Sequence, residues 1–129
     1  KSDVTDIKSS DNMFTHTMCI AVLHHLCNEE RRIKAITELF RITVSKGLIL
    51  IYVWAKEQEK FKNDKKKDVF VPWNMQKKYN DNCQDIYYRY YHLFEKNELE
   101  NLIEKSGIEV NIIESGSQMN NYYIILKKK

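Results

Sequence analysis

The sequence is poor in glycine, proline and cysteine, and it lacks long apolar runs. Its 129 residues include three glycines, one proline and three cysteines. Cys19, Cys27 and Cys83 are widely spaced and form no CxxC pair, which argues against a disulfide framework and favours the cytoplasm, or alternatively the nucleus. No apolar run reaches the roughly 18 residues that span a membrane. The opening residues Lys1–Asp6 lack the apolar segment of a signal peptide.

Composition and charge are those of an ordinary globular protein. Hydrophobic residues make up 43% of the chain and charged residues 30%, so the chain can bury a core. Its length gives room for one domain or for part of a larger one. The net charge of +3 permits a polyanionic partner without requiring one. The alternative is a protein with lysine-rich surface loops.

The first half of the sequence predicts a strand, a helix and a second strand. Met18–Leu23 is a short apolar run, typical of a strand buried on both faces of a parallel sheet. Asn28 is a good N-cap, and the apolar spacing after it predicts a surface helix of about four turns. Gly47 is expected to supply the turn that follows. Leu48–Trp54 predicts a central strand, also buried on both faces.

The second half is organised differently. Residues 56–68 form a lysine-rich stretch that we expect to be a mobile loop, either solvated or tracking phosphates. The apolar island Val69–Trp73 is expected to dock over the mouth of a site. A helix and an antiparallel strand pair complete the chain. Their predicted bounds are Asn97–Ser106, Ile108–Glu114 and Tyr122–Lys127, with a turn at Gly116–Asn121.

This order of elements predicts an α/β fold with an antiparallel pair of strands at its end. A complete doubly wound sheet normally carries five or more strands with helices on both faces. The chain has too few parallel strands for that, so residues 1–129 are expected to form part of a single domain. Because unpaired strand edges seek partners, we expect the chain to associate with itself.

Several blocks of the sequence resemble one family of methyltransferases. Cys19–Leu26 with Glu29–Arg32 resembles the central strand and helix of tRNA wobble-uridine methyltransferases. This family includes the methyltransferase domain that animals fuse to an AlkB-type oxygenase. A strand followed by two histidines is common among methyltransferases, and the combination with the further blocks is more specific. Those blocks are Leu50–Ala55 with Gln58–Glu59, Asp68–Trp73, Arg89–Phe94 with Glu98–Leu99, Glu114–Gly116 and Asn121–Tyr123.

The resemblance implies a fold, a reaction and partners. The fold is the Rossmann-like class I methyltransferase fold, of which this chain would be the C-terminal part. The reaction transfers a methyl group from S-adenosylmethionine to the carboxylate of 5-carboxymethyluridine at the wobble position of tRNA. Because this carboxylate is ionised at neutral pH, the enzyme mainly positions the reactants and excludes water. The family also implies a small zinc-binding activator subunit.

The resemblance places part of a cofactor site. Asp3, with Val4 beside it, matches the aspartate that faces the adenine. Cys19, Ala21 and His24 lie at the strand end that lines the cofactor. The glycine-rich turn that wraps the amino acid end of the cofactor is absent, because no two glycines lie close together. The acidic residue that holds the ribose is absent too, so we expect about half of a cofactor pocket.

The adjacent residues His24 and His25 allow three interpretations. Adjacent histidines at a strand end should point apart, and no third ligand is suitably spaced, which argues against a metal site. A structural role at the corner between strand and helix is the second interpretation. The third is a role in the site, because α/β folds bind ligands at the carboxyl ends of their strands. In that case we expect His25 to be catalytic and to face the substrate, and His24 to face the cofactor or the fold.

Arg89 is the strongest candidate for binding and activating the substrate carboxylate. An arginine can hold a carboxylate through two parallel hydrogen bonds, and Tyr91 and His92 are candidates for contacting the nucleobase. Trp54 is a further candidate for binding the substrate or for a lid over the cofactor, and packing in the core is its alternative. Alternatively, several tyrosines of the segment Ile86–Phe94 belong to the core, and we expect about half of these tyrosines to be buried. Two rival functions stay open. They are methylation of a small molecule and a truncated chain without enzymatic activity.

Overall fold

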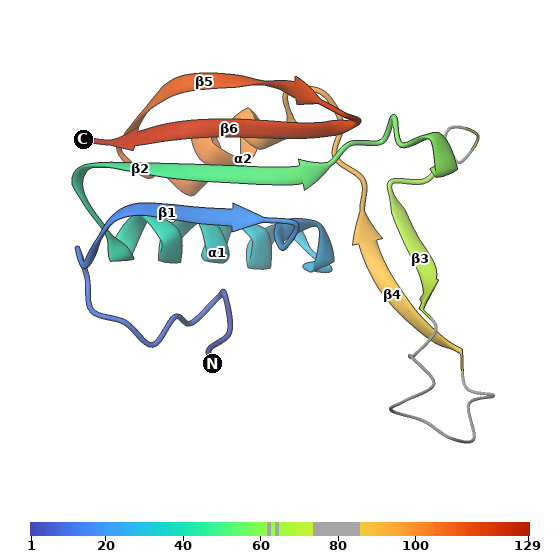
Figure 1. Cartoon of the computed structure of the whole chain (residues 1–129), viewed down its shortest axis with the longest axis horizontal. Helices are drawn as coiled ribbons and strands as arrows, with labels where there is room; N and C mark the ends of the chain where they lie inside the picture. Colours follow the sequence, from blue (N-terminus) through green and yellow to red (C-terminus); the bar gives the residue numbers. More distant parts are fainter. Residues whose placement is uncertain (62, 64, 74–85) are drawn as a thin grey trace.

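The computed structural model describes residues 1–61, 63, 65–73 and 86–129. These residues form a four-stranded sheet and a separate two-stranded hairpin (Figure 1). In chain order the elements are β1 (Phe14–Ile20), η1 (Leu23–His25), α1 (Glu29–Ile42), β2 (Thr43–Trp54), η2 (Glu59–Phe61), β3 (Asp68–Trp73), β4 (Tyr87–His92), α2 (Glu98–Ser106), β5 (Val110–Gln118) and β6 (Asn121–Lys128).

The larger sheet has the strand order β1-β2-β6-β5. β1 and β2 are parallel and are joined by α1, whereas β6 is antiparallel to both of its neighbours. This topology confirms the predicted α/β fold with a terminal antiparallel pair. The carboxyl ends of β1 and β2 lie at the same edge of the sheet, and the hairpin of β3 and β4 leaves the body at that edge (Figure 1).

Both helices cover the same face of the sheet (Figure 1). Alternate residues of a strand point to the same side, so Ile49, Ile51 and Val53 of β2 are all fully buried on this face. Ile124 and Leu126 of β6 are fully buried in the same core. These five side chains form the floor on which α1 and α2 pack.

The helix α1 begins where the sequence predicts. The side chain of Asn28 accepts a hydrogen bond from the backbone N–H of Arg31 at 2.9 Å. Ile36 and Leu39 are buried on the side that faces the sheet, as the apolar spacing predicts. No helix among the described residues is long and apolar enough to cross a membrane.

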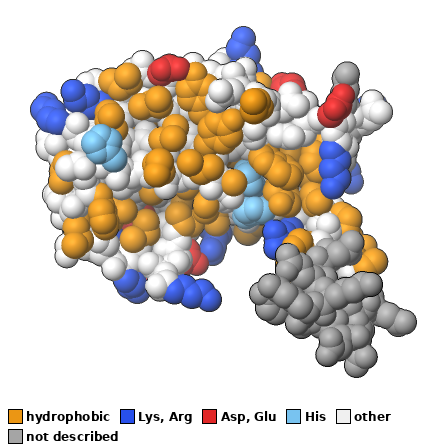
Figure 2. Space-filling view, in the orientation of Figure 1, with side chains coloured by type: hydrophobic (Ala, Val, Ile, Leu, Met, Phe, Trp, Pro, Cys, Tyr) orange, Lys and Arg blue, Asp and Glu red, His pale blue; other side chains and the backbone are white. Residues whose placement is uncertain are grey.

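The opposite face of the sheet is uncovered. Met18 and Ile20 of β1 are 71% and 51% exposed. Figure 2 shows hydrophobic side chains spread over this face. The prediction that β1 and β2 are buried on both faces is therefore wrong, because both helices lie on one side. The residues of β2 and β6 that flank Met18 and Ile20 in register are half-buried, and they are Leu50, Tyr52, Tyr123 and Ile125.

The corner after β1 also differs from the prediction. The sequence predicts a strand over Met18–Leu23, whereas β1 ends at Ile20. Ala21 then adopts a left-handed φ of 58°, and the chain enters the short turn η1. Periodicity cannot place this end, because Leu23 beyond the corner is fully buried like a strand residue.

Gly47 is needed for space and not for its backbone angles. Lys46, and not Gly47, adopts a left-handed φ, of 65°. A Cβ atom on Gly47 would lie 2.6 Å from Cγ2 of Thr43 and 2.8 Å from the carbonyl oxygens of Thr15 and Val44. The expectation that Gly47 supplies the turn is therefore wrong. Close approach of neighbouring backbone explains the glycine instead.

The terminal hairpin is tighter than the sequence predicts. β5 continues through the expected turn as far as Gln118. The turn consists of Met119 and Asn120, which both have positive φ, of 47° and 59°. Two consecutive left-handed residues are typical of the shortest hairpin turns. Gly116 therefore belongs to a strand.

The lysine-rich stretch 56–68 is partly anchored, and two of its positions, 62 and 64, lie outside the described residues. The Nζ atom of Lys56 lies 3.2 Å from Oε1 of Glu95, and the Nζ atom of Lys67 lies 2.7 Å from Oε2 of the same side chain. Phe61 of η2 lies between Lys56 and Lys67 in the sequence, and its side chain is buried. These contacts fix both ends of the stretch. Contact with phosphates stays a prediction.

Candidate functional site

His24 joins the carboxyl ends of β1 and β2. Its side chain is buried, and its Nδ1 atom accepts the backbone N–H of Trp54 at 3.2 Å. Burial, and after it the neighbouring His25, lower the pKa of His24 to about 4, because both disfavour the charged ring. His24 is therefore neutral at pH 7 and carries its proton on Nε2.

His25 is exposed and is held by the hairpin. Its Nδ1 atom lies 3.0 Å from the carbonyl oxygen of Tyr90. Since a carbonyl only accepts hydrogen bonds, Nδ1 carries the proton in the neutral ring, and Nε2 keeps a free lone pair. The rings of His24 and His25 are 4.5 Å apart. The expectation that they point apart is wrong, because they lie on a helical turn and not at a strand end.

Tyr91 brings the candidate residues together. Its buried ring stacks on Trp54, with ring centroids 4.5 Å apart, and on His24 at 5.2 Å. Its edge meets His25 at 4.4 Å. Four predicted residues from three separate segments therefore form one aromatic cluster at the carboxyl edge of the sheet. Figure 2 shows histidine side chains bordered by hydrophobic ones where the hairpin meets the body.

Arg89 lies outside this cluster, two residues before Tyr91 on β4. Its guanidinium carbon lies 4.4 Å from the ring centroid of Trp73 on β3. The side chain is exposed, so its nitrogen atoms are open to a ligand. Residues 86–89 are exposed and residues 91–94 are buried. Among the tyrosines of this segment, Tyr91 is buried, Tyr90 is half-buried, and Tyr87 and Tyr88 are exposed, so fewer than the expected half belong to the core.

His92 is enclosed between two carboxylates. Its Nδ1 atom lies 2.8 Å from Oδ1 of Asp68 on β3, and its Nε2 atom lies 2.6 Å from Oε1 of Glu98 on α2. Burial raises the pKa of each carboxyl, but hydrogen bonds, that from His92 included, leave both lower than usual. Both ring nitrogens are thus occupied by partners that join the hairpin to α2. Binding of substrate by His92 stays a prediction.

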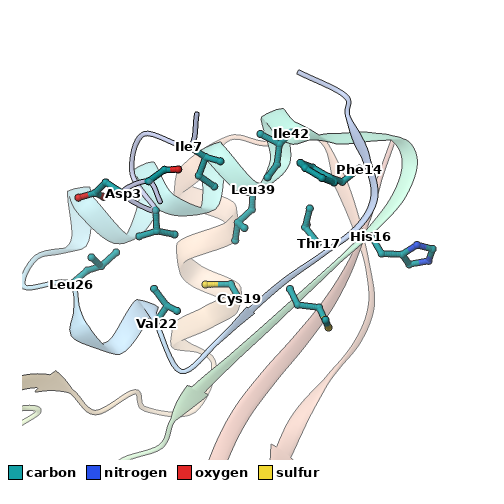
Figure 3. A pocket seen from close by; sticks show the side chains of 13 residues that line it. Asp3, Ile7, Phe14, His16, Thr17, Cys19, Val22, Leu26, Leu39 and Ile42 are labelled. Atoms are coloured by element: carbon teal, nitrogen blue, oxygen red, sulfur yellow. The ribbon is translucent and has the colours of Figure 1, made fainter. Parts of the chain in front are cut away.

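A groove of about 670 Å³ brings together three of the predicted cofactor residues, Asp3, Val4 and Cys19 (Figure 3). Its walls are the N-terminal segment, β1 and the inner side of α1, and its lining is largely apolar. Ala21 and His24 do not line it. They lie beyond it, at the corner where β1 ends.

The polar groups of this groove are already engaged. Oδ1 of Asp3 accepts the backbone N–H and the hydroxyl of Thr5 at 2.8 and 2.7 Å. These bonds, led by the one from the backbone, lower the pKa of Asp3. Burial raises the pKa of the Cys19 thiol to about 11, so the thiol stays protonated and is no nucleophile. The other oxygen of Asp3 is left for Arg31, at 3.8 Å.

Sequence reasoning assigned no role to three residues that organise the site. Asp68 and Glu98 hold His92, and Tyr90 donates its hydroxyl to Asp68 while its carbonyl oxygen accepts from His25. The contacts of Asp68 with His92 and Tyr90, and of His25 with Tyr90, join residues 22 or more positions apart, which no spacing rule finds, whereas His92 and Glu98 are only six positions apart. Among the described residues, no three His, Cys, Asp or Glu side chains are grouped to hold a metal ion.

The fold is that of S-adenosylmethionine-dependent methyltransferases. A methyltransferase of this kind from Methanosarcina mazei superposes with a TM-score of 0.69, covering 98% of this chain and 65% of its own, at 13% identity. The 1,6-didemethyltoxoflavin-N1-methyltransferase of Burkholderia thailandensis, solved with S-adenosylhomocysteine, gives a TM-score of 0.63 over 99% of this chain and 49% of its own, at 12% identity. At such identity the likeness shows the fold alone.

Comparison of sequences finds relatives that are named for one particular reaction. The chain is homologous to the tRNA (carboxymethyluridine(34)-5-O)-methyltransferase of Schizosaccharomyces pombe, at 37% identity over 98% of this chain and 62% of the relative. The Xenopus tropicalis relative with the same activity in its name, alkbh8, is 28% identical over 98% of this chain and 28% of its own length. No family model matches the chain. The chain thus spans about three fifths of the fission yeast relative.

Proposed function

We propose that this chain forms the C-terminal part of a methyltransferase domain that methylates the carboxylate of 5-carboxymethyluridine in tRNA. The observation that carries the proposal is the homology to the fission yeast enzyme over nearly the whole chain. The gathering of His25, Trp54 and Tyr91 at the carboxyl edge of the sheet supports it, since ligands of α/β folds bind at that edge.

The reaction requires that the two reactants be held in position and that water be excluded from the site. S-adenosylmethionine supplies an electrophilic methyl group when bound. Arg89 holds the substrate carboxylate through its exposed guanidinium, and the stacked rings of Trp54 and Tyr91 present an apolar wall that keeps water away. The free Nε2 lone pair of His25 accepts a hydrogen bond from a donor group of the nucleoside. No strong base is required, because the carboxylate is already ionised.

The residues present fit one part of the cofactor. The groove at Asp3, Val4 and Cys19 is apolar and large enough for a flat ring system. No glycine lines that groove, so the chain offers no backbone turn to wrap a charged amino acid end. Titration calorimetry with S-adenosylmethionine should therefore show no micromolar binding by the 129 residues alone. Micromolar binding would contradict the proposal of a partial cofactor pocket.

The direct test of function uses the full-length gene product. It is incubated with S-adenosylmethionine and tRNA that carries 5-carboxymethyluridine, and the digested nucleosides are analysed by mass spectrometry. The proposal expects the methyl ester at the wobble position. Ester formation on small carboxylic acids, with no binding of tRNA, would favour the rival small-molecule methyltransferase. A product without either activity would favour the non-catalytic alternative.

Three further expectations belong to this proposal. A small zinc-binding activator subunit should accompany the active enzyme, and its addition to the assay tests that directly. The cytoplasm, or alternatively the nucleus, is the expected location. The 129-residue chain is expected to associate with itself, for which the uncovered side chains Met18 and Ile20 give a physical reason.

A further inference from the structure

The hairpin of β3 and β4 has two chemically different faces. Directly paired residues of antiparallel strands share a face. Val71 pairs with Arg89 and Trp73 pairs with Tyr87, and both pairs lie on the face that carries Tyr91. The residues Phe70, Pro72, Tyr88 and Tyr90 occupy the opposite face. Only the first face continues into the aromatic cluster beside His24 and His25.

The face that carries Tyr91 has a cation between aromatic rings. The Arg89 guanidinium lies 4.4 Å from the centroid of Trp73, and the ring of Tyr87 lies 6.3 Å from that of Trp73. Arg89 and Tyr87 are exposed and Trp73 is half-buried. At this end of the hairpin, beyond the buried Val69 and Tyr91, two strands alone offer an aromatic side chain no core to enter. Such an exposed set is typical of a binding surface.

The spacing along β4 matches a nucleic acid strand. Arg89 lies two residues from Tyr91, which corresponds to about 7 Å along a strand. Proteins that bind single-stranded RNA stack successive bases on aromatic rings and on arginine planes, while positive charge follows the backbone. A series of neighbouring side chains offers such positions in a row. They are Trp54, Tyr91, Arg89, Trp73 and Tyr87.

We propose that Trp73, with Tyr87 beside it, stacks on a nucleotide that flanks the modified uridine, so that this face of the hairpin binds single-stranded RNA. The inference rests on the proposed function, because it takes the neighbouring cluster as the site of the uridine. Arg89 then lies between the two nucleotides, within reach of the substrate carboxylate. Because stacking is tolerant of base identity, the protein recognises the flat aromatic face of the flanking base and does not distinguish one base from another.

RNA fits this face better than a protein partner does. A protein interface is rich in apolar contacts at its centre, and the aliphatic residues of this face, Val69 and Val71, are already buried and half-buried. The exposed part carries the guanidinium of Arg89, which pairs with no acidic side chain among the described residues and lies near the ring of Trp73. Positive charge beside exposed rings is complementary to a phosphate backbone with splayed bases.

The test measures RNA binding by the full-length gene product. The probe is an anticodon stem-loop RNA with the fluorescent base 2-aminopurine next to the wobble uridine. Trp73→Ala is expected to weaken binding roughly 5- to 150-fold and to abolish the fluorescence change on stacking. Trp73→Phe should restore most of both, because it keeps a ring. Tyr87→Ala, on the same face, should weaken binding in the same direction.

The matched control is Phe70→Ala on the opposite face of the same hairpin, at a side chain that is 68% exposed. It should bind the probe like wild type. The inference is overturned if Trp73→Ala and Tyr87→Ala bind like wild type, or if Phe70→Ala weakens binding as much as they do. A wild-type protein that binds the probe through Trp73 and forms no methyl ester would sink the proposed function alone.

Discussion

The Nδ1 atom of His24 accepts the backbone N–H of Trp54 at 3.2 Å, and this bond joins the two parallel strands where the candidate site begins. Because a protonated Nδ1 cannot accept, the bond exists only while His24 is neutral. His24 is also buried, so no water can replace Trp54 as a partner. Protonation of His24 must therefore open the corner between β1 and β2.

Stability should fall in mild acid because of His24. Its pKa is about 4 in the folded chain, against 6.5 for an unperturbed histidine. Below pH 6.5 the unfolded chain takes up a proton that the folded chain does not, so this contribution is lost as the pH falls from 6.5 towards 4. The free energy of unfolding should drop by about 2 kcal/mol between pH 7 and pH 5 from this group. Urea denaturation at both pH values measures it.

The variant His24→Asn isolates the effect, because Asn keeps an acceptor for the Trp54 N–H and does not titrate. Its unfolding free energy should change less between pH 7 and pH 5 than that of wild type, by about 2 kcal/mol. His16→Asn is the matched control at an exposed histidine of β1, and it should keep the wild-type dependence. Equal pH dependence in all three proteins would contradict the buried neutral state of His24.

Arg89→Ala should abolish methyl ester formation by the full-length enzyme while its affinity for S-adenosylmethionine is kept. The exposed guanidinium is the group that would hold the substrate carboxylate, and bidentate binding of a carboxylate is lost with it. Arg89→Lys keeps the charge without the planar fork, so turnover should fall at least about tenfold. Mass spectrometry and calorimetry give the two readouts. Wild-type turnover of Arg89→Ala would remove Arg89 from the site.

Local sequence signals predicted the elements of the fold well. The N-cap Asn28, the strand that includes Leu48–Trp54 and the C-terminal stop at Gly107 depend on neighbours within a few positions, so composition and spacing reveal them. The sequence also proposes His25, Trp54 and Tyr91 as site residues, and the fold brings their rings together, while their roles stay predictions.

Long-range pairing could not be predicted in the same way. The sequence grouped the tyrosines of β4 together, whereas their pairing with β3 divides them between two faces. The sequence predicts that His92 contacts the substrate, and only the fold shows that Asp68 and Glu98 lie within hydrogen-bond distance of its two ring nitrogens. The uncovered sheet face was likewise missed, because an apolar strand has the same sequence whether one face or both are covered.

The 129-residue chain should associate in solution through β1. This strand is an unpaired edge of the sheet, and Met18 and Ile20 leave its apolar side largely exposed. Light scattering should give a mass above that of a monomer that increases with concentration. The double variant Met18→Lys and Ile20→Lys should shift the mass towards the monomer. Met119→Lys, at an 85% exposed residue of the terminal turn, is the control and should associate like wild type.

A monomeric mass for wild type at high concentration would contradict this expectation. Equal loss of association in Met119→Lys would show that added charge alone prevents it, and would remove the assignment to β1. The comparison is clean because all three side chains lie on the surface and none belongs to the buried core.

Gly47→Ala and Gly116→Ala should differ in their effect on stability, although both glycines lie in strands. At Gly47 the new Cβ would meet two carbonyl oxygens at 2.8 Å, and backbone cannot move aside without breaking the pairing of β1 with β2. We expect a loss of about 2–3 kcal/mol of unfolding free energy. At Gly116 the Cβ would lie 3.1–3.3 Å from the ring of Tyr123. That half-exposed side chain can tilt away, so the change should stay within about 1 kcal/mol. Urea denaturation of both variants measures the two losses of unfolding free energy. Equal losses would contradict the prediction that the close contact between Thr15 and Gly47 makes the alanine more costly at Gly47.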